Sequence, residues 1–119
     1  MELQGKAKLL RIFSGDSDRV HGKCLYEAIV EEARNAGLAG ATAYRGIESF
    51  GASHSIHTLK IFALSGDLPI VIEIIDSQEN IEKFVPKVNE LMDKSGKGGL
   101  IITEDVNVIR YKTGEKYKK

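Results

Sequence analysis

The glycine-rich segment 95–99 has the composition of a loop that could hold a phosphate. Gly96, Gly98 and Gly99 free backbone N–H groups for close approach, and Lys97 adds a positive charge among them. The segment lacks the spacing of a P-loop and is followed by a strand-like run rather than a helix. A hairpin or helix-exit turn would use the same glycines, so the pattern leaves an anion site and a structural turn both open.

A second cationic element near the C-terminus consists of Arg110 and Lys112. Residues two apart in a strand lie on the same face, so a strand here would point both side chains the same way. Two cations on one face suit a polyphosphate, because arginine can bind it through paired N–H donors. The alternative is an edge strand kept soluble by its charges.

The histidines His54 and His57 lie in a polar stretch with Ser53, Ser55 and Thr58. A serine–histidine pair could support hydrolysis, and two histidines could bind a metal ion. Neither arrangement has a third member in the sequence. We therefore predict no catalytic and no metal-binding residue, and assign these histidines to contact with a partner protein. A small metal- or histidine-dependent enzyme is the alternative.

An aromatic residue, Phe50, and the adjacent Gly51 follow Arg45-Gly46 at the start of the same stretch. Glycines permit close backbone approach, and an exposed aromatic side chain on a loop either packs the loop down or anchors a partner. We call residues 46–69 the excursion, because they leave one strand-like run and return to another at Leu68-Pro69. Long polar excursions of this kind often carry function.

The composition is that of one globular domain spanning residues 1–119. Seventeen acidic residues balance seventeen basic ones, which argues against a nucleic-acid partner. The single Cys24 excludes an internal disulfide and fits a reducing compartment, so we expect a cytoplasmic protein. No apolar run is long enough to span a bilayer, and we expect no direct membrane insertion.

Hydrophobic periodicity gives the elements that must position these residues. Helices are predicted at 23–36, and from the Asp76-Ser77 cap signal through Met92. Strands are predicted at 7–13, 40–47, 58–64, 69–75, 100–103 and 106–111. This order predicts an α+β ferredoxin-like plait, β-α-β-β-α-β, with an added hairpin strand in the excursion and an extra C-terminal strand.

The run 69–75 is almost wholly apolar apart from Glu73, which places it in the sheet centre or at a subunit contact. Two helices with one apolar stripe each cover only one face of a sheet. We therefore expect oligomerisation to bury the other face.

From Leu9 to Glu115 the chain resembles the PII signalling superfamily, and specifically an uncharacterised PII-like family of short bacterial and archaeal proteins. The residues that carry the resemblance to this family are Gly37–Gly46, Phe50-Gly51, His57-Thr58, Leu64-Ser65 and Asp67–Pro69. Likeness to PII proper rests on Phe50-Gly51, Leu68-Pro69, Ile72–Ile74, Val108–Arg110 and Thr113–Glu115.

The resemblance implies a homotrimer with adenine-nucleotide sites in the clefts between subunits. By position, Gly96, Gly98 and Gly99 with Lys97 would form the phosphate loop, Arg110 and Lys112 the basic pair, and Gly51 would lie near the ligand. Residues 52–65 would contact a target protein, such as a membrane transporter or an enzyme. PII's modifiable tyrosine and its 2-oxoglutarate glutamine have no counterpart between Gly51 and Pro69, so the resemblance does not extend to uridylylation or 2-oxoglutarate sensing.

Overall fold

The computed structural model describes residues 3–50, 57–58 and 68–114. Within these residues the helices are α1 (Leu25–Asn35) and α3 (Gln78–Ser95). Its strands are β1 (Gly5–Gly15), β2 (Arg19–Val20), β3 (Lys23–Cys24), β4 (Ala41–Arg45), β5 (Glu48–Ser49), β6 (His57–Thr58), β7 (Pro69–Asp76) and β8 (Leu100–Val108). None of the described helices is long and apolar enough to span a membrane.

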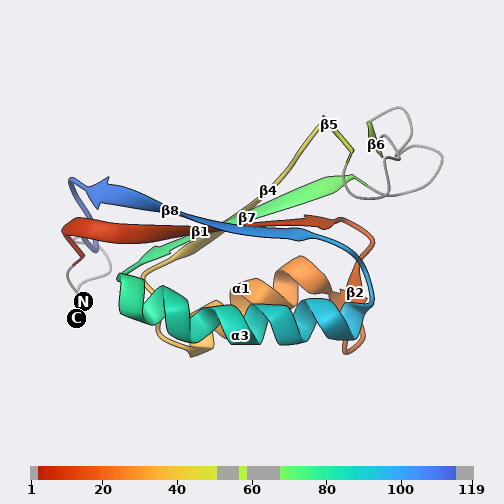
Figure 1. The fold of residues 1–119 in the computed structure, drawn as a ribbon, viewed down its shortest axis with the longest axis horizontal. Helices are drawn as coiled ribbons and strands as arrows, with labels where there is room; N and C mark the ends of the chain where they lie inside the picture. The colour runs from red at the N-terminus through yellow and green to blue at the C-terminus, as the bar shows by residue number, and fades with distance from the viewer. Residues whose placement is uncertain (1–2, 51–56, 59–67, 115–119) are drawn as a thin grey trace.

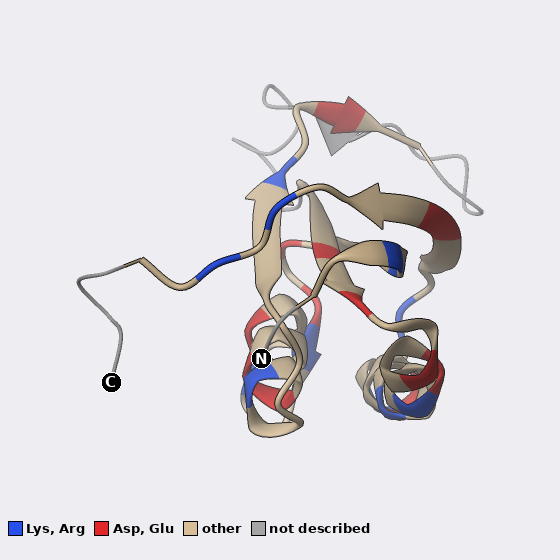
Figure 2. Ribbon diagram, turned by 90° about the vertical axis from the view of Figure 1, so that its left-hand side faces the viewer, with Lys and Arg blue, Asp and Glu red and all other residues tan. Residues whose placement is uncertain are grey.

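The main sheet is four-stranded, with the order β4-β7-β1-β8 and antiparallel pairing throughout. Figures 1 and 2 show both helices on the same side of this sheet. The arrangement confirms the predicted α+β ferredoxin-like plait, with one sheet face covered and one left open. We call the uncovered side the open face.

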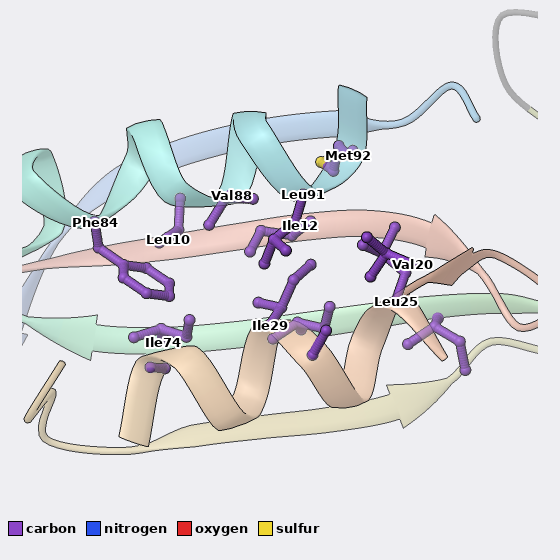
Figure 3. Close-up of a cluster of buried hydrophobic side chains, with 14 of the residues drawn as sticks. Leu10, Ile12, Val20, Leu25, Ile29, Ile74, Phe84, Val88, Leu91 and Met92 are labelled. Carbon is purple, nitrogen blue, oxygen red and sulfur yellow. The ribbon is translucent and has the colours of Figure 1, made fainter. Parts of the chain in front are cut away.

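The core lies between the sheet and the helices. Alternate residues of the two central strands point into it, among them Leu10, Ile12 and Ile72, each with 0% of its surface exposed. The helices contribute one apolar stripe each, from Ile29 on α1 and from Phe84 and Val88 on α3 among others (Figure 3). The periodicity of the sequence predicts these stripes, and the structure confirms them.

Strand β7 lies in the middle of the sheet, as its apolar run predicts. Ile70, Ile72 and Ile74 face the helices and are at most 3% exposed. On the open face, Val71 is 8% exposed whereas Ile75 is 38% exposed. The isolated subunit therefore buries β7 fully on one face and only partly on the other.

Both ends of α3 are defined by caps. The Ser77 side chain accepts a hydrogen bond from the Asn80 backbone N–H at 3.2 Å, which confirms the predicted N-terminal signal. At the other end Gly96 takes the left-handed conformation, with φ of 70°, and its N–H donates to the Asp93 carbonyl.

The start of α1 differs from the prediction. The helix begins at Leu25, and Lys23-Cys24 instead pairs with Arg19-Val20 in a two-residue hairpin. The turn residues His21 and Gly22 both have positive φ, 52° and 79°, as a type I′ turn requires. His-Gly is a weaker turn signal than Asn-Gly, so the sequence gives little indication of this hairpin.

The C-terminal strands also differ from the prediction. Residues 100–108 form the single strand β8, which pairs continuously with β1 through Glu104 and Asp105. The separate strand predicted at 106–111 is therefore wrong, and the described chain after Val108 is not a strand. Pairing on β1 holds the two acidic residues extended, although their types favour a turn. In the excursion, β5 and β6 pair as the expected hairpin, whereas most of the strand predicted at 58–64 lies outside the described residues.

Candidate functional site

The base of the excursion and the glycine-rich loop lie at the same end of the sheet (Figure 1). The excursion departs at Gly46, whose N–H donates to the Pro69 carbonyl at 2.8 Å. Beside it, the Asp16 N–H donates to the Leu68 carbonyl at 2.7 Å, and the Asp16 carboxylate accepts from Arg45 at 3.1 Å. These contacts join both ends of the excursion to the end of β1.

The glycine-rich loop reaches the same end of β1. Phe13 pairs with Leu100, and a side chain added at Gly99 would lie only 2.7 Å from the Phe13 carbonyl oxygen. A ligand held by this loop would therefore lie within a few residues of the strand that anchors the excursion. This is the geometry needed if occupancy of the loop is to affect the excursion.

The three glycines of the loop have different roles. Gly96 is required by its positive φ at the helix end, and Gly99 by its packing against Phe13 and Met92. Gly98 has neither constraint, because its φ is not positive and a Cβ there would meet nothing within 4 Å. Gly98 is therefore the loop glycine that neither its backbone conformation nor its packing requires.

This difference predicts that alanine substitutions at Gly99 and Gly98 have different effects on stability. Gly99→Ala should lower the free energy of unfolding by about 1–3 kcal/mol, because the Phe13 backbone cannot move aside without disturbing the β1–β8 pairing. Gly98→Ala should change it by less than about 0.5 kcal/mol. Urea unfolding followed by circular dichroism measures both. Equal stability of the two variants would contradict the assignment.

The basic pair Arg110 and Lys112 does not lie in a strand, contrary to the prediction. Arg110 and Lys112 are exposed and follow β8, so the expectation that they share a strand face is wrong. They also lie at the far end of β8 from the glycine-rich loop. The strand has 9 residues, and at about 3.4 Å per residue it spans roughly 30 Å. The loop and the basic pair can serve one ligand only if they come from different subunits.

Two apolar residues near the start of the excursion are exposed. Phe50 is 66% exposed, as expected of a partner contact, and Ile47, which no sequence pattern indicates, is 71% exposed. The His57 backbone pairs with Ser49 in the β5–β6 hairpin. Gly51 and His54 lie outside the described residues. Within the described part of the chain, no group of three His, Cys, Asp or Glu residues could hold a metal ion.

A line of polar side chains crosses the open face. Arg11 donates to Glu73 at 2.9 Å and to Glu104 at 2.9 Å, and the Tyr44 hydroxyl donates to Glu73 at 3.1 Å. We call these four residues the polar line. The pKa of Arg11 is raised by its hydrogen bonds, of which the one to Glu73 has the larger effect and the one to Glu104 the smaller. The pKa of Tyr44 is raised mainly by desolvation, and its hydrogen bond to Glu73 is the second cause. Glu73 stands out in the sequence, whereas its partners do not, since they come from other strands.

Exposed apolar side chains lie beside the polar line on the open face. Ile75 and Leu100, which do not belong to the polar line, are 38% and 53% exposed. Large apolar side chains grouped on one sheet face are typical of a surface that another protein covers. The structure therefore supports the expectation that the face left open by the helices is an interaction surface.

The described surface also has two hollows along α1, away from the glycine-rich loop. One, of about 350 Å³, lies between α1 and α3 and includes Leu38 and Phe84. The other lies between α1 and β4. Neither includes a predicted site residue.

Comparison with known proteins places the chain in a family. Residues 7–108 match the DUF190 family, described as an uncharacterized ACR. A UPF0166 protein of Aquifex aeolicus is 41% identical over 104 residues, covering 87% of this chain and 94% of that protein. A UPF0166 protein of Methanocaldococcus jannaschii is 36% identical over 110 residues, covering 92% of this chain and 98% of that protein.

Among solved structures, the chain is similar to CPII, a nitrogen regulatory PII-like protein of Thiomonas intermedia K12, bound to ADP, AMP and bicarbonate. The TM-score is 0.67 at 17% identity, over 88% of this chain and 90% of that one. At this identity the likeness shows the fold alone, and it agrees with the resemblance drawn from the sequence. By family match and by close relatives, the chain belongs to the DUF190 (UPF0166) family, with a PII-like fold.

Proposed function

We propose that this protein is a non-enzymatic PII-like regulator that binds an adenine nucleotide and signals its occupancy to a partner protein. The observation that carries the proposal is Gly98. It is the one loop glycine without a structural requirement, and it lies at the end of the sheet where the excursion is anchored. CPII, which shares the fold, has been solved with ADP and AMP, and this supports the choice of nucleotide.

The ligand site would be completed between subunits of a homotrimer. The glycine-rich loop and the basic pair Arg110 and Lys112 lie too far apart in one subunit to hold the same phosphates. The open face supplies an apolar surface through which copies of the chain would associate. Gly51 would approach the ligand from the excursion.

The partner would be bound through the excursion. Ile47 and Phe50 present apolar side chains next to its anchored base, and large apolar side chains of this kind commonly provide most of the binding energy at protein interfaces. His54 and His57 would add polar contacts. The partner's identity, whether a membrane transporter or an enzyme, would have to come from capture experiments.

A substitution at Gly98 tests the ligand site directly. Gly98→Val should lower the affinity for ADP at least about tenfold, since the new side chain occupies the space of the phosphates, while leaving the stability nearly unchanged. Adenosine is the control ligand, because it lacks the phosphates, and its affinity should be the same in Gly98→Val and in the unaltered chain. Calorimetric titration measures the binding of both ligands. Equal ADP affinity in Gly98→Val and in the unaltered chain would contradict the site.

A further inference from the structure

The β2–β3 hairpin lies next to the glycine-rich loop. Val20 of β2 is 4% exposed and belongs to the same core cluster as Leu91 and Met92, in the last turns of α3. Figures 1 and 3 show the hairpin beside the end of this helix, from which the chain passes into the loop. The residues on either side of Val20 are therefore held near the loop.

Those flanking residues, Arg19 and His21, are exposed. Because side chains alternate along a strand, burying Val20 turns Arg19 outward, and His21 occupies the exposed turn that follows. The Arg19 guanidinium donates to the Cys24 sulfur at 3.1 Å, a weak acceptor that leaves most of its donors for another group. Lys23, the other cation of the hairpin, is bound to Glu31 at 2.8 Å, and that hydrogen bond raises the pKa of Lys23.

The turn holds His21 at the exposed tip of the hairpin. Its φ of 52° is the one positive φ among the described non-glycine residues. Histidine adopts such a φ more often than most residues do, so the type I′ turn accommodates it. The imidazole therefore has a defined place next to Arg19.

We propose that Arg19 and His21 bind the phosphates of a nucleoside diphosphate held at Gly98 and Lys97. This inference rests on the proposed function and adds the hairpin to its ligand site. The guanidinium can bind a phosphate through two parallel donors, and the imidazole adds a third donor. Arg19 supplies positive charge from the same subunit as the loop, whereas Arg110 and Lys112 would come from a neighbour.

Substitutions that keep the hairpin intact provide the test. Arg19→Gln removes the charge, Arg19→Lys keeps the charge but loses the paired donors, and His21→Asn keeps the turn geometry. ADP affinity should fall about tenfold in Arg19→Gln, and several-fold in Arg19→Lys and in His21→Asn, whereas the affinity for adenosine should not change. Lys23→Met is the matched control, since it removes from the same hairpin a positive charge that Glu31 already neutralises. This variant should bind ADP like the original protein.

The outcomes separate this inference from the proposed function. If the unaltered chain binds ADP and the Arg19 and His21 variants bind it equally well, the hairpin inference is wrong and the proposed function stands. An equal loss of affinity for ADP and adenosine would mean that the variants disturb the loop, and would also overturn it. If the unaltered chain does not bind ADP, both proposals fail.

Discussion

Replacing Asp76 by alanine should lower the free energy of unfolding by roughly 3–5 kcal/mol, one of the largest effects expected of a single substitution in this chain. Asp76 is 0% exposed. Its carboxylate accepts hydrogen bonds from the Ala39 N–H at 2.8 Å, the Ser77 N–H at 2.6 Å and the Asn80 side-chain amide at 3.0 Å. Alanine would leave all three donors without this acceptor in a site that water does not reach.

The same carboxylate joins two connections that are distant in sequence. Ala39 lies between α1 and β4, whereas Ser77 and Asn80 begin α3. Urea unfolding at a fixed protein concentration measures the loss. Asp76→Asn retains one acceptor oxygen and should lose less, and Asp105→Asn should lose little, because the Asp105 side chain is 87% exposed. A loss below about 1 kcal/mol for Asp76→Ala would contradict this role.

Replacing Arg11 by methionine should weaken self-association more than tenfold while leaving the fold of the subunit intact. Arg11 supplies the positive charge of the polar line, between the carboxylates of Glu73 and Glu104. When a second copy covers the open face, loss of Arg11 leaves two carboxylates desolvated without their partner. In the isolated subunit the same carboxylates can still be hydrated, since their side chains are 31% and 53% exposed.

Lys8→Met is the matched control for Arg11→Met. Lys8 is also on β1 and also ion-paired, to Asp105 at 2.6 Å, but it points to the helix side of the sheet. It should not change the association. Light scattering over a dilution series of the two variants makes the comparison. Equal association of both variants would mean that the open face is not the surface through which the copies meet.

Local patterns were sufficient to predict most of the fold. The apolar run of β7 and the heptad-like spacing of α3 are long and regular, and the structure confirms both. The β2–β3 hairpin was missed because two-residue strands are too short to show periodicity. Strand β8 was divided wrongly because Glu104-Asp105 is a turn-like pair that pairing with β1 nevertheless holds extended.

The candidate site was harder to predict, because its geometry depends on residues distant in sequence. Sequence alone could not separate Gly99, which packs on Phe13 of β1, from Gly98, which packs on nothing described. It could not show that Arg110 and the loop lie at opposite ends of β8, so that one ligand would need them from different subunits. The partners of Glu73 come from β1 and β4, so no local pattern indicates the polar line.

The most direct test of the account is a calorimetric titration of ADP into the full chain, with the mass of the same sample measured by light scattering. The account predicts saturable binding, with one site for each pair of neighbouring subunits, and a mass of three 13.1 kDa chains. A monomer that shows no saturable binding of ADP, AMP or ATP would contradict it.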